Sequence, residues 1–178
     1  GLSPGFFVGA AQAGFECSGR TANHRPVVLE SCEYQSSFRH FIPHTGVITG
    51  VERDHFDCYP NASSEDAAFQ QFAAAIRPRG CLVYRKECRR TALIADVADC
   101  RTTTFSLKVR TADWFATDIQ CRGWRTHFHL LGPAERSIDV ELSTVGEHNV
   151  ENALAAMAAA AEYGVDINVA AEALSRFP

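Results

Sequence analysis

Short, continuous apolar runs separated by helical stretches constrain the first half of the chain more than any other feature. Such runs occupy residues 6–9, 26–30, 46–51 and 81–84. Runs of this length without polar alternation are typical of strands in a parallel sheet that is covered on both faces. Between the last two runs, N-cap residues and acids from Ser63 precede a stripe of apolar residues, which predicts a helix. This alternation of strands and helices predicts an α/β fold.

The pattern changes near Cys100. Four further segments look like strands, and one of them, 124–131, alternates bulky and polar residues with a period of two. We expect these segments to form a small antiparallel sub-sheet of three or four strands over about residues 102–143. Helices are expected near 148–163 and 167–176. The whole chain, 1–178, is expected to form one domain with a mostly parallel sheet flanked by helices.

The bulk composition excludes several classes of protein. The 178 residues are 46% hydrophobic and 21% charged, as in a folded domain. The net charge of −4 and the scattered basic residues give no reason to expect binding to nucleic acid or to a membrane. The seven cysteines include no Cys-x-x-Cys pair, which argues against a disulfide framework or a zinc site. We therefore expect a reducing compartment, the cytoplasm.

Two segments place acids after predicted strands. Glu30 ends the run at 26–30 and Glu33 follows it, and the run at 46–51 leads into Glu52-Arg53-Asp54-His55-Phe56-Asp57. Ligand sites of open α/β sheets gather at the carboxyl ends of strands. Carboxylates suit Mg²⁺, and His55 could bind a metal through a neutral ring nitrogen. The alternatives are an acid that caps the next helix and an ordinary solvated turn.

A third polar segment, Gly146-Glu147-His148-Asn149-Val150-Glu151-Asn152, precedes the alanine-rich helix. Asn149 and Asn152 are three residues apart and would share a helix face, where carboxamides could contact an adenine edge. The alternative is an N-cap at Asn149. His127 and His129 are expected to form a solvent-facing pair, and Trp114 and Trp124 to lie in the core of the sub-sheet.

Taken in order, these three segments resemble the central domain of the Mur ligases, the ATP-dependent amide-forming enzymes of peptidoglycan synthesis. The family patterns are Glu-Ala-(Asp/Cys)-Glu with a later Ser-Phe, Thr-Asn-(Ile/Leu)-Glu-x-Asp-His-x-Asp, and Gly-x-His-Asn-x-x-Asn-Ala. They match residues 30–38, 49–57 and 146–153. The third pattern is shared across the family, whereas the first points to its alanine-adding branch. The resemblance covers essentially the whole chain.

The resemblance implies roles for eight residues. The implied magnesium ligands, near the ATP γ-phosphate, are Glu30 and His55. The residues implied to line the adenine and ribose are His148, Asn149 and Asn152. The acids expected to support the metal ligands from outside the coordination shell are Glu33, Asp54 and Asp57. The implied substrates are ATP, UDP-N-acetylmuramate and L-alanine, which react through an acyl phosphate whose formation needs Mg²⁺ to screen two anions.

Two departures from the family pattern limit what this chain can do alone. Gly50 replaces an asparagine, and no Gly-x-x-x-x-Gly-Lys-(Ser/Thr) loop occurs. In the family, that loop lies shortly before the position that matches Gly1, and further domains lie on both sides. We therefore expect an N-terminally truncated central domain that is inactive alone and self-associates through an exposed sheet edge. The alternatives are another Mur-type ligase, such as the tripeptide-recycling type, and a non-catalytic nucleotide-binding module.

Overall fold

A computed structural model of the chain describes residues 3–9, 17–22, 26–32, 34–52 and 58–177. Four of the predicted site residues lie outside this described part: Glu33, Asp54, His55 and Asp57. The other predicted site residues lie within it. In the described part, no helix is both long enough and apolar enough to cross a membrane.

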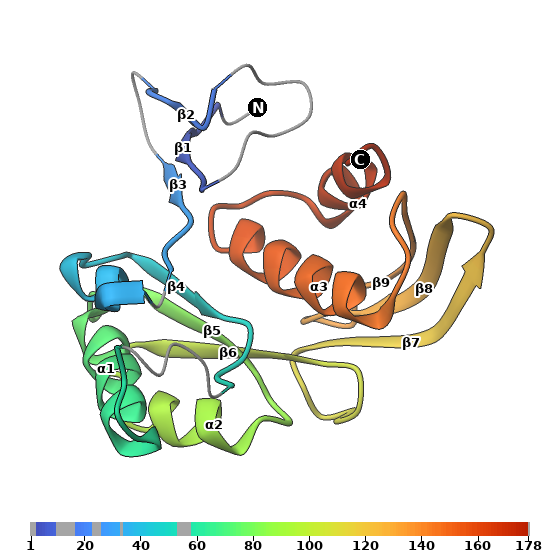
Figure 1. Cartoon of the computed structure of the whole chain (residues 1–178). Helices are drawn as coiled ribbons and strands as arrows, with labels where there is room; N and C mark the ends of the chain where they lie inside the picture. Colours follow the sequence, from blue (N-terminus) through green and yellow to red (C-terminus); the bar gives the residue numbers. More distant parts are fainter. Residues whose placement is uncertain (1–2, 10–16, 23–25, 33, 53–57, 178) are drawn as a thin grey trace.

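Six strands form the main sheet, and in spatial order they are β4 (Thr45–Ile48), β5 (Cys81–Arg85), β6 (Arg101–Ser106), β7 (Trp114–Arg122), β8 (Arg125–Leu131) and β9 (Ser137–Leu142). Strands β4 to β7 pair in parallel, and β7 to β9 form an antiparallel meander. This arrangement, visible in Figure 1, confirms the α/β fold and the mostly parallel sheet with an antiparallel part.

The antiparallel part is smaller than expected, because the segment predicted from residue 102 is a parallel strand. Strand β6 pairs in parallel with both of its neighbours. Its pairing with β7 is limited to Phe105 with Trp114 and Ser106 with Phe115, so β7 continues the sheet beyond the end of β6. A short loop can therefore join these two parallel strands, although parallel neighbours usually need a long crossover.

Helices cover both faces of the main sheet and create two apolar cores. α1 (Ala62–Ala75) and α2 (Arg89–Ala95) lie on one face, and α3 (Glu147–Ala161) and α4 (Ile167–Ser175) on the other (Figure 1). Strand β5 serves both cores, because successive side chains point to opposite faces. Cys81 and Val83 belong to the core under α3, whereas Leu82 belongs to the core under α1.

The start of α1 shows how local sequence determines a helix end. Asn61 is the N-cap, and its side chain accepts a hydrogen bond from the backbone N–H of Ser64 at 2.9 Å. The Ser64 hydroxyl in turn accepts from the backbone N–H of Asn61. This reciprocal capping box satisfies two N–H groups that a helix end leaves without partners. The predicted helix is thus confirmed.

A separate three-stranded sheet contains β1 (Gly5–Phe7), β2 (Gly19–Arg20) and β3 (Val27–Leu29), in the order β2-β1-β3. It stands apart from the main sheet (Figure 1). The side chains of β3 are therefore exposed, with Val27 at 61%, and the prediction of a strand buried on both faces is wrong here. A short 3₁₀ helix, η1 (Tyr34–His40), lies between β3 and β4 in the chain.

The two tryptophans differ in environment. Trp114, at the start of β7, is buried as predicted, but Trp124 is 85% exposed, so its assignment to the core is wrong. Trp124 lies in the two-residue turn between β7 and β8, after Gly123 with a φ of +62°. Positive φ is common in such hairpin turns. A side chain at the tip of the hairpin projects beyond the sheet and has no core to enter.

Candidate functional site

Glu30 follows the last residue of β3, as the sequence predicts. Its backbone N–H donates to the carbonyl of Phe7 at 2.9 Å, which continues the pairing with β1. Its exposed carboxylate accepts a hydrogen bond from the backbone N–H of Gly9, with 2.7 Å between N and Oε2. The carboxylate is thus held near the ends of two parallel strands. In the described part of the chain, its other oxygen, Oε1, has no hydrogen-bond partner and could bind a hard cation.

The second predicted metal segment is described only at its start. Val51 is buried after β4, and its carbonyl accepts a hydrogen bond from Arg90 Nη1 at 3.2 Å. Because His55 lies outside the described residues, a magnesium site shared by Glu30 and His55 stays a prediction. In the ranges that the structure describes, no group of three or more His, Cys, Asp or Glu side chains is arranged to hold a metal.

Arg90 joins three elements, and the sequence patterns did not identify it. It lies in α2 and donates from Nε to Asp66 Oδ1 at 2.8 Å and from Nη2 to Glu65 Oε2 at 2.7 Å, both on α1. Burial would lower the pKa of Arg90, but the bonds to Glu65 and Asp66 outweigh it and raise the pKa. Arg90 thereby ties α1, α2 and the exit of β4 together.

The third predicted segment forms the beginning of α3. Gly146 is the N-cap, with a φ of +108°, and a Cβ there would lie 2.6 Å from Cε1 of His148. The positive φ favours glycine, whereas the close atom belongs to the end of the exposed His148 side chain, which could move away. Asn149 is not the cap. Its Nδ2 donates to the carbonyl of Val145 at 2.9 Å, so its amide oxygen is the atom left to accept from a ligand. His148 and Asn152 are exposed on the first two turns.

A charged cluster links this segment to the main sheet, and it was also missed from sequence. Arg85, the last residue of β5, lies 2.8 Å from Glu151 of α3, between Nη2 and Oε1. It also lies 3.2 Å from Glu87, between Nε and Oε1. Burial raises the pKa of Glu151, against the opposing effect of Arg85. The only sequence signal was the run of charged residues 85–87 directly after a predicted strand.

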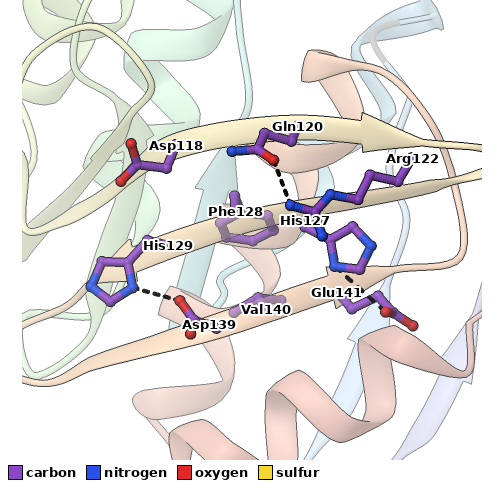
Figure 2. Close-up of a pocket in the computed structure, with 9 residues that line it drawn as sticks. All are labelled: Asp118, Gln120, Arg122, His127, Phe128, His129, Asp139, Val140 and Glu141. Carbon is purple, nitrogen blue, oxygen red and sulfur yellow. Dashed lines mark hydrogen bonds and ion pairs between the residues drawn. The ribbon is translucent and has the colours of Figure 1, made fainter.

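His127 and His129 lie on the outer face of the antiparallel meander, as predicted, and line an open hollow of about 400 Å³. Nδ1 of His129 is 2.7 Å from Asp139 Oδ1, and Nδ1 of His127 is 3.5 Å from Glu141 Oε2. Figure 2 shows the two rings apart along the strand, each beside its own acid. Each histidine therefore pairs across strands, and the two do not converge on a shared ligand.

These features define a class of domain: an α/β sheet with polar groups at strand ends and at the start of a helix beside the sheet. The comparison with known families identifies the family to which this domain belongs. Residues 18–160 match the Mur ligase middle domain, and the chain belongs to that family. The family predicted from the three ordered motifs is thus confirmed.

The chain is similar in sequence to enzymes that are named as ligases. The UDP-N-acetylmuramate–L-alanine ligases of Clostridium novyi and Kineococcus radiotolerans are 30% and 34% identical to the chain over 176 and 180 residues. In both comparisons the match covers 99% of the chain and 38% of the relative. The chain thus spans about two-fifths of the length of the curated relatives it matches.

Solved structures agree on the fold. The UDP-N-acetylmuramate:L-alanyl-gamma-D-glutamyl-meso-diaminopimelate ligase from Neisseria meningitides has a TM-score of 0.86 and 26% identity. That match covers the entire chain and 58% of the ligase. The UDP-N-acetylmuramate–alanine ligase from Thermotoga maritima has a TM-score of 0.81 and 26% identity, with coverage of 98% and 38%.

Proposed function

We propose that this chain is the central, ATP- and magnesium-binding domain of a cytoplasmic ligase that joins L-alanine to UDP-N-acetylmuramate. The observation that carries the proposal is the match of 99% of the chain to ligases named for that reaction. The position of three residues at the start of α3 adds support: His148, Asn149 and Asn152. The two carboxamides there could recognise a nucleotide. The phosphate loop and the two flanking domains would belong to the same longer enzyme.

In this proposal, Glu30 and His55 hold the magnesium ion. The exposed carboxylate of Glu30, held by the N–H of Gly9 at the end of β3, fits a cation that prefers oxygen ligands. The bound ion would supply the positive charge that screens the γ-phosphate from the substrate carboxylate. Three acids, outside the described residues, would support the ligands by hydrogen bonding: Glu33, Asp54 and Asp57.

The residues at the start of α3 would bind the nucleotide base and ribose. The amide oxygen of Asn149, whose NH₂ is engaged by Val145, can accept a hydrogen bond from the adenine amino group. Asn152 and His148 are exposed next to it and can contact the base edge and the ribose. Fixing the nucleotide in this way would direct its γ-phosphate toward the carboxyl ends of the parallel strands of the main sheet.

The proposed reaction has two steps. The muramate carboxylate attacks the γ-phosphorus of ATP, which breaks the bond between that phosphorus and the oxygen of the β-phosphate, so that an acyl phosphate forms and ADP leaves. The amine of L-alanine then attacks the acyl carbon, loses a proton and expels inorganic phosphate, so that one amide bond forms per ATP cleaved. Positioning and charge screening, rather than covalent participation of the protein, would provide the catalysis.

The test is a ligation assay on the natural gene product that contains these residues. We expect ADP release that requires both UDP-N-acetylmuramate and L-alanine, and a large loss of turnover in Glu30→Ala and His55→Ala. Release that requires a tripeptide in place of L-alanine would instead identify the recycling type of ligase, to which the structural similarity is also high. ADP release with neither acceptor would contradict both assignments.

Residues 1–178 alone are proposed to be inactive, because they contain no phosphate-loop sequence. Turnover of the three substrates by this polypeptide would refute that statement.

We also propose that the isolated polypeptide self-associates through the exposed apolar strand β3 and the edge strand β4. Light scattering should show dimers that Val28→Lys weakens, whereas a strict monomer at high concentration would contradict self-association.

A further inference from the structure

Two ion pairs connect α3 to the main sheet, one near each end of the helix. Near its beginning, Arg85 at the end of β5 lies 2.8 Å from Glu151. At its C-terminal end, Arg101 at the start of β6 pairs with Glu162, the C-cap residue. Both pairs join an arginine at the end of a main-sheet strand to a glutamate of α3 or its C-cap, but the Arg85 side chain is 24% exposed and the Arg101 side chain 63%. They differ in what lies beside them, because only the first is next to the proposed nucleotide-binding segment.

The Arg85 pair is better shielded from water than an ordinary surface pair. The side chains of Arg85 and Glu151 are 24% and 16% exposed. Glu87 approaches the same guanidinium at 3.2 Å, and neither carboxylate oxygen of Glu87 has a hydrogen-bond partner among the described residues. The rigid, planar guanidinium can face both carboxylates at once, whereas a lysine ammonium on a flexible stem would hold them less well.

The beginning of α3 needs such a restraint. Its N-cap, Gly146, has no side chain with which to anchor the first turn. Glu151 lies between Asn149 and Asn152 in the sequence, so a restraint on Glu151 limits both the rotation of the helix and its movement along the sheet. An error of 1 Å in the position of a group that holds substrate can change a rate by roughly 100-fold.

We propose that Arg85 is a positioning residue for nucleotide binding. By holding Glu151 against the end of β5, it orients the first two turns of α3 and therefore the side chains of Asn149 and Asn152. Glu87 lies within ion-pair distance of the same guanidinium and adds a second favourable charge contact. This inference rests on the proposed function, because it takes those two asparagines to be nucleotide contacts.

The test compares Arg85→Gln with the matched control Arg101→Gln in the full ligase. We expect Arg85→Gln to raise the KM for ATP about tenfold, within the range that misplacement of a binding group can produce. The KM values for the other two substrates should change less than about twofold, since these substrates would be bound elsewhere. Arg101→Gln removes the equivalent pair at the other end of α3 and should leave the KM for ATP unchanged.

Two further variants distinguish a failure of the proposed role of Arg85 from a failure of the proposed nucleotide site. If Arg85 acts through Glu151, the double variant Arg85→Gln/Glu151→Gln should raise the KM for ATP no more than Arg85→Gln does. An unchanged KM for ATP in Arg85→Gln, together with a raised one in Asn152→Ala, would overturn the role of Arg85 and leave the proposed function standing. An unchanged KM in Asn152→Ala would overturn the nucleotide assignment itself.

A second readout does not depend on catalysis. Amide hydrogen exchange at the beginning of α3 should be faster in Arg85→Gln than in the unsubstituted chain, because local opening would be easier. In Arg101→Gln the faster exchange should instead appear at the end of the helix. Equal exchange at the beginning of α3 in the Arg85→Gln variant and the unsubstituted chain would overturn the positioning role.

Discussion

Removal of Arg90 should destabilise the domain far more than removal of an ordinary surface arginine. Arg90 is the partner of Glu65, which is only 1% exposed, and it also binds Asp66 and the carbonyl of Val51. In Arg90→Ala, the carboxylate of Glu65 would remain inside the protein without its partner. A buried charge left unpaired is strongly unfavourable, because it has lost both water and its counter-ion.

The structure sets the expected magnitude. Breaking a buried pair by removing one partner costs roughly 3–5 kcal/mol. The Arg90 side chain is 25% exposed, so water can enter the space it leaves, and we expect the lower end, about 3 kcal/mol. Asp66, with 37% exposure, can be solvated and adds little. For a chain of this size, a loss of 3 kcal/mol corresponds to a fall in Tm of about 6–12 °C.

Thermal unfolding followed by circular dichroism would measure this loss. The control is Arg176→Ala, which removes an exposed helical pair with Glu172 and should cost only about 0.3–0.5 kcal/mol. The double variant Glu65→Met/Arg90→Met should recover much of the stability, because apolar side chains of similar volume can replace a buried pair. A fall in Tm for Arg90→Ala no larger than that for Arg176→Ala would refute the reasoning.

Three further predictions concern other parts of the fold. Leu154→Ala, at a fully buried position, should lower the urea midpoint by an amount equivalent to about 3–5 kcal/mol with no change in the m-value. The N–H of Asn168 lowers the pKa of Asp166, so the stabilisation that Asp166→Ala removes should be fully present well above pH 3.8, the ordinary value, and should be lost progressively as the pH falls through the lowered pKa. Burial raises the pKa of Cys81 to about 12, so a thiol reagent at pH 8 should label exposed Cys121 in the native protein but Cys81 only after unfolding.

Local patterns predicted the elements that form the main sheet and its covering helices. The run at 81–84 is β5, and the alternating segment at 124–131 is β8. The N-cap signals near Ser63 mark the start of α1. Such features are readable from sequence because periodicity and capping depend on neighbours within a few residues. The segment at 102–107 was assigned to the wrong sub-sheet, because strand direction depends on pairing with distant residues.

The candidate site could be predicted only as a set of segments. Their order in the chain pointed to the family, which the match of residues 18–160 confirms. The structure places Glu30 at a strand end and His148 to Asn152 on the first turns of α3. The meeting of Glu30 with His55 stays a prediction. The roles of Arg85 and Arg90 were not predicted from the sequence, because their ion-pair partners are distant in the chain and no local pattern indicates such pairs.

The sequence by itself determined the fold class, the family and the identity of the polar segments, since these follow from short-range periodicity and from motif order. Only the tertiary structure decided that β3 is exposed, that Trp124 lies outside the core, that Arg85 ties α3 to the main sheet and that Arg90 ties α1 to α2. A residue's burial and its ion-pair partner depend on which distant elements lie beside it. For Glu30, the sequence supplied a carboxylate at a strand end, and the fold supplied the backbone of Gly9 that holds it.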